Sequence, residues 1–316
     1  MSGRKANAAL TGAALIALSG CELFPMFPTE PVAPPTVETP EEETVAPLSD
    51  ESRELAAYYR RVQDGLVAQG LLRTDGGGPD VPFSTRTLLR NFEKIALYEE
   101  YVTAGGRLVA RETPSQIHRW EDSVRISVEF GASVPLAQRT RDRNAIISYA
   151  NRLARVSDHP IRVSELAPNF HVFVVNEEER RALSPRLRQI VPGIDNAALT
   201  ELENLPRSTF CLVFAVDPGN RGTYTKAVAI IRGEHPDLMR LSCIHEEIAQ
   251  GLGLSNDSPA ARPSIFNDDE EFGLLTRHDE LLLEMLYDPR LRAGMSASEA
   301  MPIAEIIAAE LMGGPS

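Results

Sequence analysis

The sequence predicts an α+β fold in which two long helices pack on a mixed β-sheet, preceded by a helical hairpin and a disordered tether. Residues 124–130 alternate between apolar and polar side chains, and residues 209–216 are almost wholly apolar. Both patterns are typical of strands, whereas residues 143–156 and 237–251 repeat apolar side chains at helical spacing. The hydrophobic share of 43% and the charged share of 24% indicate an ordinary globular chain.

Residues 1–21 have the features of a bacterial lipoprotein signal peptide. Arg4 and Lys5 precede an apolar run that is too short to span a bilayer and that ends in LSGC. In this interpretation Cys21 becomes the acylated N-terminus, and its several acyl chains anchor the protein in a membrane. Because Glu22 follows it rather than Asp, we expect an outer-membrane lipoprotein that faces the periplasm of a Gram-negative bacterium. An ordinary secretory signal with a chance cysteine is the alternative.

Two appendages are expected before the main domain. Residues 22–50 are rich in Pro, Glu, Thr and Val, and such a composition buries too little apolar surface to fold, so this segment is a tether. Residues 51–104 contain two segments of helical periodicity, 50–73 and 84–102, separated by the Gly- and Pro-rich break at 75–82. They are predicted to form a helical hairpin.

The main domain is expected over residues 105–300, with residues 301–316 as a C-terminal tail. The run at 209–216 is so apolar that we expect it to be a central strand of the sheet. In order, the expected elements are strand 124–130, helix 143–156, strands 161–163 and 170–175, an inserted helix 177–190, strands 209–216 and 225–231, and helix 237–251.

The chain's most informative stretch, residues 246–257, has the sequence EEIAQGLGLSND. Glu246 and Gln250 are four residues apart, so they share one face of a helix and can converge on one point. Glu247 lies at the edge of that face. On charge pattern alone, the stretch could also be a solvated acidic helix face.

A glycine then ends this helix. Gly253 can adopt a positive φ and turn the chain, so that Asn256 and Asp257 swing back toward the same point. We therefore expect the acidic helix face and one of these two residues to share a cleft beside the strand at 225–231.

This pattern resembles the zinc helix of metzincin metalloproteases, H-E-x-x-H-x-x-G-x-x-H/D. Glu247 falls on the catalytic glutamate of that family and Gly253 on its helix-ending glycine. The three metal-ligand positions then contain no histidine and fall on Glu246, Gln250, and Asn256 or Asp257.

A second block strengthens the resemblance. In the matrixin branch of the metzincins the zinc helix is followed by S-V-M and then by a helix of the type L-T-x-x-D-x-x-x-x-x-x-L-Y. Here residues 264–266 read S-I-F, so Phe266 replaces the methionine. The helix positions are matched by Leu275, Thr276, Asp279, Leu286 and Tyr287. Over roughly residues 105–300 the chain is also similar to a proteobacterial lipoprotein family of unknown function, domain-of-unknown-function family 2927, which implies no activity.

The altered ligand positions predict that no zinc and no other cofactor is held. Zinc prefers nitrogen and sulfur ligands, whereas this motif offers only oxygens. The alternative is a divalent cation with oxygen ligands from Glu246, Gln250 and Asp257. His245 precedes the motif and could turn toward the cleft as a binding residue.

Two cysteines remain once Cys21 is acylated. Cys211 lies in the apolar strand and Cys243 just before the motif, and a cell-envelope location permits a disulfide between them. Two buried free thiols are the alternative.

Three functions fit these patterns. The first is a pseudoenzyme that binds a peptide or an envelope component, with a basic group attracted by Glu246 and Glu247. The second is a metal-dependent hydrolase or peptidase in which Glu247 is the general base. The third is a structural tethering protein that binds through its helical hairpin. The net charge of −13 argues against nucleic-acid partners.

Overall fold

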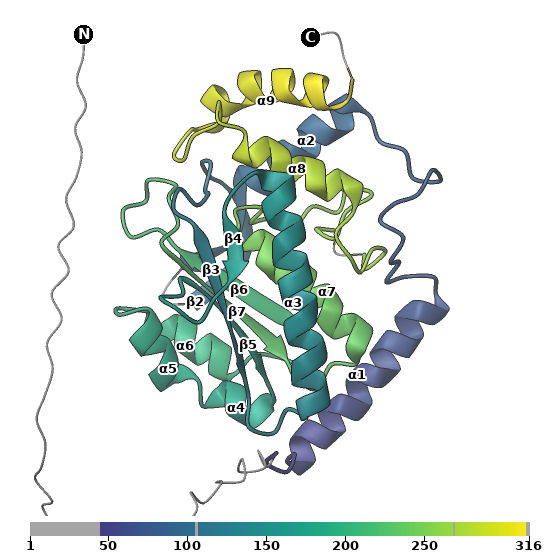
Figure 1. Ribbon diagram of the computed structural model, residues 1–316, viewed down its shortest axis with the longest axis vertical. Helices are drawn as coiled ribbons and strands as arrows, with labels where there is room; N and C mark the ends of the chain where they lie inside the picture. Colours follow the sequence, from purple (N-terminus) through teal and green to yellow (C-terminus); the bar gives the residue numbers. More distant parts are fainter. Residues whose placement is uncertain (1–44, 105–106, 268, 314–316) are drawn as a thin grey trace, which may run out of the picture. The chain divides into compact units, whose positions relative to one another are not determined.

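The computed structural model describes residues 45–104, 107–267 and 269–313 (Figure 1). The signal peptide, Cys21 and the tether up to residue 44 lie outside the described residues. The fold is mixed α and β, as predicted. Its main sheet has the strand order β4-β3-β5-β7-β6, with all neighbours parallel except β6 and β7. The strands are β3 Val124–Phe130, β4 Ile161–Val163, β5 Phe170–Val175, β6 Cys211–Val216 and β7 Lys226–Arg232.

Helices cover both faces of this sheet. The two long helices α3 (Leu136–Ser157) and α7 (Asp237–Gln250) pack on one face, as predicted, through a core that includes Val172 and Ala229. On the other face, Phe173 and Ile230 pack with α4 (Glu177–Arg181), α5 (Ser184–Ile190) and α6 (Asn196–Glu203). The remaining helices are α1 Asp50–Ala68, α2 Thr85–Ala96, α8 Arg277–Tyr287 and α9 Ala297–Leu311.

Strand β6 lies at the edge of the sheet, so the prediction that it is central was wrong. In the described part of the chain it pairs only with β7, whose other side pairs with β5. Its apolar character has another cause. Val213 packs with the core that contains α7, while Leu212 and Phe214 pack with the core of α5 and α6. A strand with helices on both faces is apolar throughout, whether or not its edge is paired.

The predicted helical hairpin does not form. Helix α1 packs beside α7 and β6 through a cluster that contains Tyr59, Met239 and Phe210, whereas α2 packs on α8 and α9. The second helix also ends at Ala96, before the predicted boundary of 102, because β1 (Tyr98–Ala104) pairs antiparallel with β2 (Arg107–Pro114). Both helices are amphipathic, and an amphipathic pattern does not specify the surface on which a helix packs.

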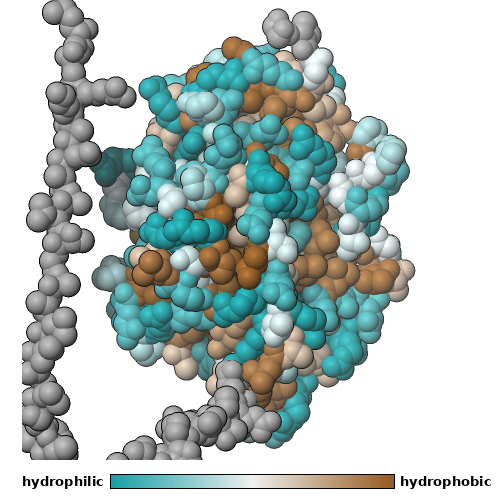
Figure 2. Space-filling view, in the orientation of Figure 1, coloured by the Kyte–Doolittle hydropathy of each residue, from teal (hydrophilic) through white to brown (hydrophobic). Residues whose placement is uncertain are grey.

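Most of the predicted C-terminal tail belongs to a helix, α9, which ends at Leu311. Ser296 and Glu299 form a capping box at the start of α9, and this helix packs on α2 and α8. Its buried residues are Ala300, Ala304, Ile307 and Ala308. None of the described helices is long and apolar enough to cross a membrane. Figure 2 shows one face of the folded part, on which small groups of hydrophobic residues alternate with hydrophilic ones.

Candidate functional site

Two glycines set the end of the motif helix. Helix α7 ends at Gln250, and a Cβ on Gly251 would lie 2.5 Å from the ring of Phe170 on the sheet. Gly253 has a φ of +121°, and a Cβ there would lie 2.1 Å from the carbonyl oxygen of His118. A side chain at either position would clash, and at Gly253 the backbone itself favours glycine. The helix therefore ends and turns as the motif predicts.

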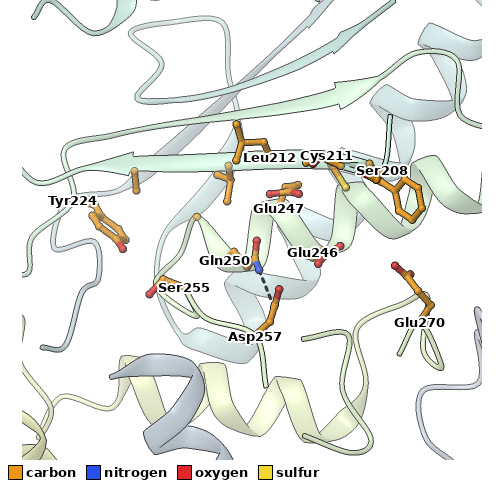
Figure 3. Close-up of a pocket in the computed structure, with 15 residues that line it drawn as sticks. Ser208, Cys211, Leu212, Tyr224, Glu246, Glu247, Gln250, Ser255, Asp257 and Glu270 are labelled. Atoms are coloured by element: carbon orange, nitrogen blue, oxygen red, sulfur yellow. Dashed lines mark hydrogen bonds between the residues drawn. The ribbon is translucent and has the colours of Figure 1, made fainter. Parts of the chain in front are cut away.

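A cleft of about 270 Å³ lies between α7 and β6 (Figure 3). Glu246, Glu247 and Gln250 line it from the helix, and Asp257 lines it from the loop that follows. The structure thus brings four of the candidate residues together. The strand along the cleft is β6 and not the strand at 225–231, because β6 occupies the edge of the sheet next to α7.

Of the two residues that could complete the motif, Asp257 is the one that lines the cleft. The side-chain Nε2 of Gln250 donates a hydrogen bond to Oδ1 of Asp257 over 3.0 Å, drawn as a dashed line in Figure 3. Asn256 points elsewhere: its side chain is buried, and its Nδ2 donates to the carbonyl oxygen of Lys94 at 2.9 Å. The sequence pattern could not decide whether Asn256 or Asp257 returns to the cleft. In the structure Asp257 does so, while Asn256 joins the loop to the end of α2.

His245 is a core residue. Its ring stacks on Tyr149 with centroids 4.0 Å apart, and its Nδ1 accepts a hydrogen bond from the backbone N–H of Leu275. Burial, with a smaller contribution from the charge of Arg152, lowers the pKa of His245 to about 3. It does not line the cleft. A neutral ring held in this way has a structural role.

The predicted disulfide between Cys211 and Cys243 is present, with Cα atoms 5.8 Å apart. It joins the first residue of β6 to α7 and so fixes the two walls of the cleft to each other. The Cys211 sulfur and carboxylate oxygens of Glu246 and Glu247 lie within 4.8 Å of one another. Nδ1 of His235 lies 3.8 Å from the sulfur of Cys243. The sequence analysis missed this grouping, although Cys243 precedes Glu247 by one helical turn.

The second matched block has a structural role. Thr276 and Asp279 form a capping box at the start of α8, which explains the spacing L-T-x-x-D. The Asp279 carboxylate also accepts from the hydroxyl of Ser264, at 2.5 Å, and from the N–H of Ile265. Phe266 is fully buried in the core and does not line the cleft. The residues of this block therefore hold the segment around Ser264 against the start of α8.

The cleft is acidic. Glu270, which the sequence analysis also missed, adds a fourth carboxyl group to those of Glu246, Glu247 and Asp257, and none of the described lining residues is Lys, Arg or His. Such a concave surface favours cationic groups. For a metal ion, the side chains at the motif positions provide oxygen donors, which suit Ca²⁺, Mg²⁺ or Mn²⁺ better than Zn²⁺.

The fold and the site define a mixed α/β protein with an acidic cleft between an edge strand and a long helix. The chain belongs to the family described as protein of unknown function DUF2927, whose profile matches residues 85–305. The match begins at α2 and ends within α9, so the family domain extends beyond the expected N-terminal boundary at 105. No curated protein and no solved structure matches the chain significantly.

Proposed function

We propose that the protein is a lipid-anchored protein of the cell envelope that binds an extended peptide carrying a basic side chain, without cleaving it. One observation carries the proposal: the open edge of β6 runs along a cleft that four carboxyl groups line. The signal-peptide features of residues 1–21 support the envelope location.

The edge of β6 supplies the main-chain part of the interaction. All six of its residues are partly exposed, and β7 pairs with only one edge of the strand. A peptide in extended conformation can add to such an edge through N–H and C=O groups, with side chains seated in pockets alternately. Because the disulfide holds Cys211 against α7, the strand and the cleft remain aligned before binding, which lowers the entropic cost of association.

The carboxyl groups supply the preference for a basic side chain. Glu246 and Glu247 lie next to each other on α7, and Asp257 and Glu270 enter from the following chain. A Lys or Arg side chain placed here gains charge-assisted hydrogen bonds. Affinity should therefore fall as salt is raised, since part of the site is open to solvent.

The motif positions favour binding over hydrolysis. A catalytic zinc is held by nitrogen, sulfur and carboxylate ligands, and the positions equivalent to its histidines hold Glu246 and Gln250. The side-chain amide of Gln250 already donates a hydrogen bond to Asp257.

Matched peptides test the proposal. Fluorescence anisotropy with an extended peptide that contains one Lys should show binding at least roughly tenfold tighter than the same peptide with norleucine, as a desolvated charge pair predicts. N-methylation of alternate backbone nitrogens should abolish binding, because it removes strand pairing. If the norleucine peptide and the N-methylated peptide bound as tightly as the Lys peptide, the proposal would be refuted.

A pair of variants locates the site. Glu246→Gln should weaken binding of the Lys peptide several-fold and leave the norleucine peptide unaffected. Glu305→Gln removes the same charge from an exposed position on α9 and should change neither. Equal loss in both variants would show that net charge, not the cleft, attracts the peptide.

The hydrolase alternative has one observation in its favour: Glu247, at the position of the catalytic glutamate, is buried beside the cleft. Incubation of the peptides with Mn²⁺, Ca²⁺ or a chelator, followed by mass spectrometry, distinguishes the two functions. Cleavage that Glu247→Gln abolishes, in a variant that still folds, would replace the binding function by a peptidase. The tethering alternative relied on a helical hairpin, and α1 and α2 do not form one.

A further inference from the structure

Five potential metal ligands lie around the disulfide where β6 starts beside α7, Glu246 and Glu247 next to Cys211 and His235 next to Cys243. Cys211 comes from β6, Cys243, Glu246 and Glu247 come from α7, and His235 comes from the turn before that helix. Oxygens of the two glutamates lie within 4.8 Å of the Cys211 sulfur, and Nδ1 of His235 lies 3.8 Å from the Cys243 sulfur. Figure 3 shows Cys211 and Glu247 side by side at this end of the cleft.

The types of ligand, and the separation of one pair of them, match a zinc site. Zinc binds four ligands in a tetrahedron, with bonds of about 2.3 Å to sulfur and about 2.1 Å to nitrogen, so two such ligands lie about 3.6 Å apart. The separation of 3.8 Å between His235 and Cys243 is close to this value. In the oxidised protein, however, both sulfurs belong to the disulfide, and only a thiolate is an effective ligand.

His235 provides an independent indication. Its side chain is buried, with 2% of its surface exposed, and it packs against Tyr59 with ring centroids 4.4 Å apart. Nδ1 faces the Cys243 sulfur, and Nε2 has no hydrogen-bond partner in the described part of the protein. Buried polar groups are usually paired with oxygen or nitrogen partners. A role as a metal ligand accounts for an imidazole that faces a sulfur instead.

We propose that reduction of the Cys211–Cys243 disulfide creates a zinc site made of the two thiolates, His235 and one carboxylate from Glu246 or Glu247. A dithiol reductant supplies two electrons and two protons: the S–S bond breaks, two thiols form, and the dithiol becomes a disulfide. Zinc then displaces the two thiol protons and binds the sulfurs.

Helix α7 and the pairing of β6 hold the backbone that carries most of these ligands in place. Cys243 and Glu247 are four residues apart on α7 and so share one face of the helix. Cys211 is held opposite them because β6 pairs with β7 along its length. The two sulfurs must separate to about the distance between two ligands of one tetrahedral zinc. The His235 ring, which contacts Cys243, and one of the two glutamate side chains beside Cys211 must also rotate toward the metal.

Metal titration of oxidised and reduced protein tests the site. The mature chain with Cys21→Ser is used throughout, so that no other thiol is present. After reduction and removal of the reductant, Co²⁺ should bind one equivalent with a thiolate-to-cobalt charge-transfer band, and Zn²⁺ should displace it. The oxidised chain should give no such band.

Variants identify the ligands. In the reduced chain, Cys211→Ser and Cys243→Ser should each weaken zinc binding by at least about 100-fold, and His235→Gln or Glu246→Gln/Glu247→Gln by about tenfold or more, as loss of a ligand predicts. Glu305→Gln, on the exposed face of α9, should bind as the parent does. A band of equal strength in the oxidised chain, or in Cys211→Ser/Cys243→Ser, would overturn the proposal.

Near-ultraviolet circular dichroism covers the case in which reduction loosens the fold. If the reduced chain loses its tertiary signal, one equivalent of Zn²⁺ should restore it, because the metal then replaces the crosslink between β6 and α7. A reduced chain that takes up no zinc, whether it keeps its tertiary signal or fails to regain it, would refute the site.

Discussion

The side-chain amide of Gln250 donates a hydrogen bond to Oδ1 of Asp257 across the turn at Gly253, with 3.0 Å between the two atoms. This contact joins the last turn of α7 to the loop after Gly253, so an amide from the helix and a carboxylate from the loop lie side by side in the cleft.

Two substitutions should create a zinc site in the cleft. With the disulfide intact, Glu246→His/Gln250→His places two imidazoles four residues apart on α7, beside Asp257. Nitrogen ligands suit zinc, so we expect one equivalent of Zn²⁺ to bind with a dissociation constant in about the micromolar range or below. Isothermal titration calorimetry measures it.

In that variant we expect Asp257 to be the third zinc ligand, and Asn256 provides the control. A further Asp257→Asn change should weaken zinc binding by about tenfold or more, whereas Asn256→Ala should not, because Asn256 faces Lys94. If Asn256→Ala were the more damaging of the two for zinc affinity, the loop would not return as described.

Loss of the disulfide should lower the free energy of unfolding. Cys211 and Cys243 are 32 residues apart, and closing a loop of this length restricts the unfolded chain by about 3–4 kcal/mol. Cys211→Ala/Cys243→Ala should therefore unfold at a lower urea concentration than the oxidised parent. An unchanged midpoint would show that the crosslink adds no stability.

The buried ion network around Glu177 should make stability depend on acid pH. Glu177 contacts Arg180 and Arg232, and all three are nearly fully buried. Burial alone would raise the pKa of Glu177, but the two guanidinium groups lower it below the usual 4.5. The charged carboxylate therefore stabilises the fold above about pH 4.5, and this contribution is lost as the pH falls through the lower, folded-state pKa.

Removal of the Glu177 charge should destabilise the fold. Glu177→Gln leaves two buried cations without their partner and should lower the free energy of unfolding by about 3–5 kcal/mol at pH 7. The free energy of unfolding of this variant should also fall less steeply than that of the parent as the pH is lowered. Glu178→Gln, at the exposed neighbouring position on α4, is the control and should have little effect. Urea unfolding from pH 7 to pH 3 measures both variants.

Acylation of Cys21 is a prediction about a part of the chain outside the described residues. Mass spectrometry of protein from a Gram-negative host should find a mature chain that begins at Cys21 and carries acyl groups, and Cys21→Ser should release the protein from membranes. An unmodified N-terminus at another residue would contradict this prediction.

The local features of the site could be predicted from the sequence. The spacing of Glu246 and Gln250 places both on one helix face, Gly253 determines where that helix turns, and the T-x-x-D spacing of Thr276 and Asp279 corresponds to a capping box. The disulfide was also predictable, since only Cys211 and Cys243 remain after Cys21. Each inference depends on residues close together in the chain or on a count of one residue type.

Tertiary contacts decided the rest. The apolar residues of β6 are the same for a central strand and for an edge strand with helices on both faces, and only pairing with β7 determined which it is. Similarly, His245 is buried because its ring stacks on Tyr149. Asn256 points away from the cleft because it donates a hydrogen bond to the carbonyl oxygen of Lys94, so Asp257 is the residue that returns to the cleft. The sequence by itself determined the helix face and its turn, because these are set by backbone geometry over a few residues. The position of the cleft, and the meeting of Cys211 with Glu247, depend on contacts between distant segments.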